Sequence, residues 1–169
     1  MILPVITIVM IMLLLGGVMW VCQAYRMLRM ARFHLMDSWT ELKAALNDRR
    51  EMIPYIVAAM PVNISPILDV LGNACDLAAN VEGVQECSRA EARLSAAMSK
   101  LFTQLDTEAP IETLEILSPL RDRLKEQEMR VTLLKEAYNR QADLFNALQL
   151  GGAARMLVSL GLVLPAEKF

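Results

Sequence analysis

The stretch that decides the fold is ILPVITIVMIMLLLGGVMWVC, which occupies residues 2–22. Twelve of its 21 residues are Leu, Ile or Val, and at roughly −0.3 to −0.6 kcal/mol each they contribute about −4 to −7 kcal/mol towards membrane insertion. As a helix the stretch is roughly 31 Å long, which matches the hydrocarbon core of a bilayer. We therefore expect residues 1–24 to form a transmembrane anchor that is bound to the lipid bilayer through residues 2–22.

A cleaved signal peptide is the main alternative for this segment. It requires a basic N-terminal region, an apolar run of about 7–15 residues and small residues before the cleavage site. The first basic residue is Arg26, the apolar run is too long, and Trp20 and Val21 precede Cys22 where small residues are needed. The same two residues oppose a lipoprotein signal at Cys22. The uncleaved anchor is the favoured interpretation.

The distribution of charge around the apolar stretch predicts its orientation. Arg26, Arg29 and Arg32 follow the stretch, and no charged residue precedes it. Positively charged flanks stay on the cytoplasmic side of a membrane. We expect a single-pass protein of the cell inner membrane, with its N-terminus outside and its C-terminal domain in the cytoplasm.

The remaining composition excludes several classes of function. With 17 Lys and Arg against 19 Asp and Glu, the net charge is −2, which gives no reason to expect nucleic-acid binding. Three cysteines and one histidine predict neither a disulfide framework nor a metal site. The glycine pairs at 16–17 and 151–152 lack the Lys-Ser/Thr of a phosphate-binding loop. We expect no catalytic residues, no cofactor and no metal.

Beyond residue 24 the apolar residues recur with the alternating three- and four-residue spacing of helices. Four such stripes occupy residues 35–46, 53–78, 90–105 and 117–148. Each narrow stripe must be buried against other helices. The pattern predicts an all-α fold, in which an N-terminal transmembrane helix is followed by an antiparallel bundle of about four long helices, with coiled-coil-like packing, over residues 25–169.

Glycine and proline predict where these helices begin and end. Gly83, followed by a capping-box pattern of Ser88 and Glu91, separates the second and third stripes. Pro110 is placed to begin the fourth helix, and the glycine pair at 151–152 is placed to end it before a short apolar tail.

Three further prolines lie inside the predicted helices, where proline removes a backbone hydrogen bond. They are Pro61, Pro66 and Pro119, and each costs about 3 kcal/mol in a regular helix interior. We expect kinks at these sites, or a break of the second helix near residues 61–66.

Several residues occur in the order and spacing of a known family. They are Trp39, Arg49-Arg50, Met52-Ile53-Pro54, Glu128, Tyr138-Asn139, Phe145-Asn146, Gly161-Leu162, Pro165 and Phe169. In these features the chain resembles the LemA family of bacterial membrane proteins. The resemblance implies a single-pass anchor and a cytoplasmic antiparallel helical bundle. No enzymatic activity is established for this family, so the resemblance implies a non-enzymatic role. One branch of the family takes part in magnetosome membrane formation.

Candidate catalytic groups each have a simpler structural interpretation. His34 is the only histidine, so it lacks partners for metal binding or proton transfer. Cys75 and Cys87 fit small buried residues better than nucleophiles, because no base accompanies them. The carboxylates Glu108, Glu112 and Glu115 are expected in the first turns of a helix, and Glu126 and Glu128 follow later in the same helix.

Three further groups have both a structural and a functional interpretation. Arg49-Arg50 is expected to end the first helix and pair with Asp48 or Glu51, or else to bind a partner carboxylate or lipid headgroup. The amides of the last helix either fix helix register or form a recognition strip; they are Gln127, Asn139, Gln141 and Asn146. The methionines 27, 30 and 36 pack within the protein or form an adaptable surface for another membrane protein.

The function hypothesis that fits these features best is a non-enzymatic scaffold or adaptor for membrane or cytoplasmic proteins. The first alternative is a self-assembling, membrane-organising protein that forms homo-oligomers through Gly16-Gly17 and the methionine-rich segment after the span. The second is a membrane-bound hydrolase that uses clustered carboxylates.

Overall fold

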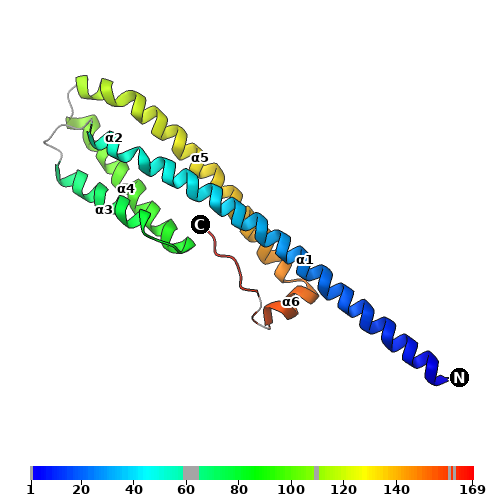
Figure 1. The fold of residues 1–169 in the computed structure, drawn as a ribbon. Helices are drawn as coiled ribbons and strands as arrows, with labels where there is room; N and C mark the ends of the chain where they lie inside the picture. Colours follow the sequence, from blue (N-terminus) through cyan, green and yellow to red (C-terminus); the bar gives the residue numbers. More distant parts are fainter. Residues whose placement is uncertain (1, 59–64, 109–110, 160, 162) are drawn as a thin grey trace. The chain divides into compact units, whose positions relative to one another are not determined.

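The computed structural model describes residues 2–58, 65–108, 111–159, 161 and 163–169, and all regular structure in these residues is helical (Figure 1). The helices are α1 (Ile2–Glu51), α2 (Ile53–Ala58), α3 (Ser65–Ala79), α4 (Val84–Glu108), α5 (Ile111–Gln149) and α6 (Gly152–Ser159). The predicted all-α fold with an N-terminal apolar helix is confirmed.

The first part of α1 is long and apolar enough to cross a membrane, judged by its length and composition. None of the side chains in its most apolar window is buried within the protein. Large apolar side chains of this part, such as Leu13, Leu14 and Met19, are exposed. This is the pattern of a helix whose apolar surroundings are supplied from outside the chain.

The chain divides into two compact units. Unit 1 comprises Met1–Ser38 and Arg140–Ala166, and unit 2 comprises Trp39–Asn139 and Glu167–Phe169. The boundary predicted between an anchor of residues 1–24 and a bundle of residues 25–169 stays a prediction.

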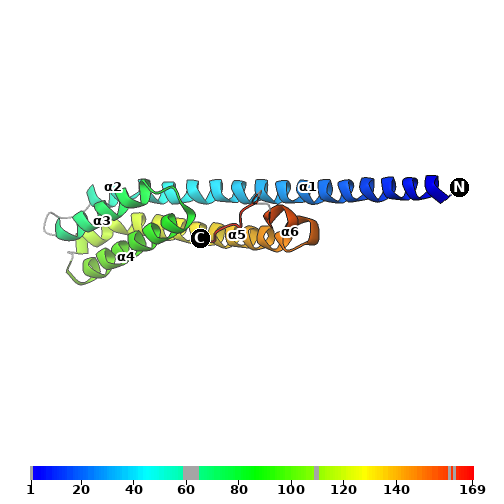
Figure 2. The ribbon, with the colours of Figure 1, turned by 90° about the horizontal axis from the view of Figure 1, so that it is seen from below.

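Unit 2 is a helical bundle around one apolar core. The core is formed by Ile53, Ile56, Leu71, Ala78, Ala90, Leu94, Ala97, Met98, Leu101, Leu105, Leu117 and Leu124. Within the unit, α3 packs along α4 (Figure 2). The last part of α1 runs antiparallel to α5, because Trp39 contacts Tyr138 while Asp48 contacts Arg130.

The predicted boundaries hold at some sites and fail at others. Gly83 directly precedes α4, as expected, but Ser88 and Glu91 lie inside that helix, so the predicted capping box is wrong. Glu108 ends α4 and does not lie in the first turn of the next helix. Gly152 begins α6, a helix that the sequence did not predict in the apolar tail.

The kinks or breaks predicted at the prolines have different outcomes. Pro119 lies within α5, which continues as one helix from Ile111 to Gln149. Pro66 is the second residue of α3, where its missing N–H is not needed. Helices lie on both sides of residues 59–64, and the predicted break near residues 61–66 falls mainly on this stretch, outside the described residues. Pro110 is also outside them.

Candidate functional site

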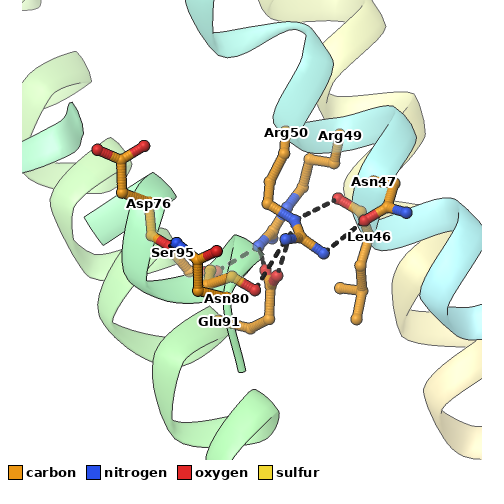
Figure 3. Close-up of polar contacts among 9 residues, drawn as sticks. Leu46, Asn47, Arg49, Arg50, Asp76, Asn80, Glu91 and Ser95 are labelled. Carbon is orange, nitrogen blue, oxygen red and sulfur yellow. Dashed lines mark hydrogen bonds and ion pairs between the residues drawn. The ribbon is translucent and has the colours of Figure 1, made fainter. Parts of the chain in front are cut away.

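A buried cluster of charged side chains lies in unit 2 (Figure 3). Arg49 and Arg50 are in the last turn of α1, and Glu91 is in α4. Arg49 forms an ion pair with Glu91, and the Nε atom of Arg50 lies 3.4 Å from the other carboxylate oxygen of Glu91. The exposed fractions of the three residues are 4%, 9% and 4%. We call these residues the arginine–glutamate cluster.

The positions of the cluster residues follow from helical periodicity. The buried leucines of α1 recur every seven residues at Leu28, Leu35 and Leu42, and Arg49 occupies the next position of this series. On α4, Glu91 lies four residues after buried Cys87 and three before Leu94, at the spacing of the inward face. Both helices therefore direct a charged residue into the bundle.

The arginines also bind other groups around the cluster. Arg50 donates to the backbone oxygen of Ala78 at 2.8 Å and to Oδ1 of Asn47 at 2.6 Å. Arg49 donates to Oγ of Ser95 at 3.1 Å. Because Ala78 is in the last turn of α3, Arg50 places a positive charge at the C-terminal end of that helix, where the helix dipole favours it. The cluster thus ties α1, α3 and α4 together.

Electrostatically the cluster combines two cations with one anion. Burial raises the pKa of Glu91 above its ordinary value, although the guanidinium groups of Arg49 and Arg50 oppose this shift. The predicted pairing of the arginines with Asp48 or Glu51 is wrong. Asp48 instead pairs with Arg130 of α5 at 3.1 Å. The prediction failed because the ion pair joins residues that are 42 positions apart in the sequence.

The candidate catalytic groups that the structure describes are two thiols, the histidine and three carboxylates of α5. Burial raises the pKa of both the Cys75 and the Cys87 thiol, which disfavours the nucleophilic thiolate. His34 is exposed in unit 1. Glu115, Glu126 and Glu128 are also exposed; the side chains of Glu108 and Glu112 are outside the described set. No group of three potential metal ligands gathers among the described residues.

The end of the chain is held in unit 2 by two neighbouring residues of α5. The Asn139 side chain donates to the backbone oxygen of Phe169 and accepts from its N–H, at 3.1 and 2.8 Å. The Tyr138 hydroxyl donates to the Glu167 oxygen at 2.9 Å. Trp39 packs against both the Tyr138 and the Phe169 ring. Burial raises the pKa of Tyr138, and the negative charge of Glu167 adds to the shift.

The same type of contact recurs in unit 1. Asn146 donates to the oxygen of Ala166 and accepts from its N–H, at 3.0 and 2.8 Å. Gln149 donates to the oxygen of Leu164 at 3.2 Å. Asn139 and Asn146 therefore bind the backbone of the chain's own C-terminal tail, which neither sequence-based interpretation had foreseen. Oε1 of Gln127 is buried without a hydrogen-bond donor among the described residues.

An apolar surface follows the candidate span on α1 in unit 1. Met27, Met30 and Phe33 recur every three residues and are 53%, 68% and 68% exposed. We call these three residues the exit stripe. Met27 and Met30 also line an apolar groove of about 660 Å³, together with Met19 and Leu148. Exposed apolar patches of this kind mark sites of protein or membrane interaction.

The segment that carries the arginine–glutamate cluster and the tail-binding amides also matches a known family. A family model described as the LemA family matches residues 38–154, which is more than half of the chain. The chain belongs to the LemA family. The LemA family is not known as enzymatic. No curated protein matches the chain. The family match begins after the candidate span, so the span is characterised by its own length and composition.

Proposed function

We propose that this LemA-family chain is a non-enzymatic scaffold or adaptor of the bacterial inner membrane. In this proposal, α1 crosses the membrane once, the N-terminus is outside and the helical bundle is cytoplasmic. The outward-facing apolar side chains of α1 support the anchor. The basic residues Arg26, Arg29 and Arg32, directly after the apolar stretch, support the orientation.

The observation that carries the scaffold proposal is the exit stripe. Its residues lie between about 7 and 17 Å along the helix from Cys22, and so beyond the hydrocarbon core. Methionine side chains are flexible and polarisable and adapt to differently shaped partners. An amphipathic helix of a partner protein fits such a surface. The partner would be a membrane or cytoplasmic protein that exposes an apolar helix face.

The anchor contributes to this function by keeping the exit stripe at the membrane, which raises its local concentration for partner proteins there. A protein that is confined to the membrane surface meets other membrane-associated proteins more often than a freely diffusing protein does. Binding through a modest surface such as the exit stripe then suffices. The raised pKa values of Cys75 and Cys87 and the exposure of Glu126 and Glu128 support a role without catalysis.

Site-specific photocrosslinking in intact membranes tests the proposal. A photoreactive residue at Phe33 is compared with one at Leu133, an apolar residue of α5 that is 62% exposed. We expect a discrete adduct with another protein from position 33, not from position 133, and a weaker adduct after Met30→Asp. No adduct from position 33 contradicts the proposal.

Self-assembly is the second candidate, and one observation favours it. A Cβ atom added at Gly16 or Gly17 would meet no atom within 4 Å, so both glycines present an open surface for close helix contact. In the same experiment, crosslinking of position 33 only to a second copy of the chain would favour this role.

Two further measurements test the location. A reporter fused after Phe169 should be active in the cytoplasm, and periplasmic activity would reverse the proposed orientation. The chain should stay in membranes that are washed with alkaline carbonate.

A further inference from the structure

The turn between α5 and α6 contacts α1 near the end of the candidate span. Residues 150–151 connect the two helices, and Gly152 begins α6. A Cβ atom on Gly152 would lie 3.1 and 3.3 Å from two ring atoms of Trp20. The backbone at Gly152 therefore lies directly on the Trp20 indole, and both views of the ribbon show this corner beside α1 (Figures 1 and 2). All of these residues belong to unit 1.

The corner turns apolar side chains outward. Leu150 is 79% exposed and Met156 is 60% exposed, while Ala153 and Ala154 are buried. Within α6, Ala153 and Ala154 thus face the protein, whereas Met156 faces its surroundings. In water this arrangement leaves apolar surface exposed to solvent, whereas a lipid environment would cover it.

The charge of this region matches an anionic surface. Residues 144–166 contain no Asp or Glu, and their one charged residue is Arg155, which is exposed. Unit 1 as a whole has five arginines against two aspartates, a net charge of +3. Unit 2 has 12 basic against 17 acidic residues, a net charge of −5. Basic segments next to a span are attracted to anionic lipid headgroups.

The length of α6 decides between crossing and lying on the membrane. Its eight residues reach about 12 Å, far less than the hydrocarbon core of about 30 Å. Trp20, which the corner contacts, is near the end of the apolar stretch, where aromatic residues occupy the membrane interface. The corner is therefore at the depth of the headgroups when α1 spans the bilayer.

From these observations we infer that the α5–α6 corner, residues 150–156, is a second membrane contact that lies in the headgroup region beside α1. Leu150 and Met156 enter the boundary of the acyl chains, and Arg155 binds anionic headgroups. This inference rests on the proposed membrane anchoring and extends it, because two contacts fix the orientation of unit 1 where a single span leaves it free to rotate.

The chain's own methionines allow a test without substitutions. The full-length protein, with isotope-labelled methionine methyl groups, is placed in nanodiscs of phosphatidylcholine and phosphatidylglycerol that contain nitroxide-labelled lipids. Met156 and Met129 are matched reporters, because their exposed fractions are 60% and 61% and Met129 lies in unit 2. Met12 and Met19 report on the span itself.

We expect the nitroxide lipids to broaden the signals of Met12, Met19 and Met156 and to leave that of Met129 sharp. If Met156 stays as sharp as Met129 while Met12 and Met19 are broadened, the anchor stands and the inference about the corner is overturned. Equal broadening of Met129 and Met156 overturns it as well, since lipid contact would then be unspecific. Sharp signals at Met12 and Met19 overturn the anchor and the corner together.

A charge reversal tests the role of the arginine separately. Arg155→Glu should reduce the broadening of Met156 several-fold in nanodiscs with phosphatidylglycerol, and that of Met19 should not change. An unchanged Met156 signal in the variant would contradict headgroup binding by Arg155.

Discussion

Replacing Arg49 with methionine tests the arginine–glutamate cluster. Methionine fills much of the space of the arginine stem but removes its charge. Glu91 then keeps only Nε of Arg50 at 3.4 Å, because the terminal nitrogens of Arg50 donate to Ala78 and Asn47. A buried charge that loses its partner destabilises a protein by about 3–5 kcal/mol. We expect the free energy of unfolding of Arg49→Met to fall by about this amount at neutral pH.

The effect should depend on pH in a defined direction. Burial raises the pKa of Glu91, and Arg49 is the strongest influence that lowers it, so the substitution raises this pKa further. A group whose pKa is higher in the folded than in the unfolded protein contributes stability that is present below the unfolded pKa and is lost as the pH rises through the folded pKa. The deficit of Arg49→Met should therefore grow from acidic to neutral pH.

Unfolding of the full chain in detergent micelles, followed by circular dichroism, measures this difference. Arg130→Met is the matched control, because the Arg130–Asp48 pair is 54% and 49% exposed and such pairs contribute about 1 kcal/mol or less. The double variant Arg49→Met/Glu91→Leu should recover part of the loss, since it removes the buried carboxylate together with Arg49 and leaves Arg50 with its hydrogen bonds to Ala78 and Asn47. If Arg49→Met is no less stable than Arg130→Met, or if the double variant is the least stable, the argument from burial is refuted.

Three further predictions concern the tail and the thiols. Asn146→Leu removes two hydrogen bonds to Ala166, each contributing about 0.5–1.5 kcal/mol. Hydrogen exchange at the Ala166 amide should therefore accelerate about 5- to 150-fold. An unchanged rate would show that Asn146 does not hold the tail. Because the pKa of Tyr138 is raised, its stabilisation of the tail is complete below the ordinary tyrosine value and is lost as the pH rises through the higher folded value. Proteolysis of the tail should thus accelerate at alkaline pH, and Tyr138→Phe should remove that dependence. Alkylation of half-buried Cys75 and buried Cys87 at neutral pH should be slow in the folded chain and fast after denaturation, as mass spectrometry can measure. Fast labelling of the folded chain would contradict their raised pKa values.

Features that depend on neighbouring residues could be predicted from the sequence. The apolar stretch of residues 2–22 identifies a helix long enough to cross a membrane, because length and composition are local properties. The periodic apolar stripes identify the helices of the bundle for the same reason. The helix start at Gly152 was not predicted, since the contact between its backbone and Trp20 depends on how the chain folds back.

The partners of buried polar groups could be predicted only in part. Arg49 continues the series Leu28, Leu35 and Leu42, so the burial of its side chain could be predicted from the seven-residue spacing. Glu91 was interpreted as a capping residue because Ser88 precedes it, although its spacing from Leu94 places it on the buried face of α4. That these two residues pair with each other follows from tertiary packing, because nothing near either residue in the sequence distinguishes one distant partner from another.

The separation of charge along the chain connects the anchor with the proposed scaffold role. Unit 1 carries +3 and unit 2 carries −5, although the whole chain is nearly neutral. An anionic membrane surface attracts the first unit and repels the second, within a screening length of about 8 Å at physiological ionic strength. Adsorption of unit 2 onto lipid would hide its surface from other proteins, and its negative charge opposes that adsorption. In the proposed function, the charge of unit 1 thus favours contact with the bilayer, and the charge of unit 2 favours an acidic bundle that stays accessible to proteins in solution.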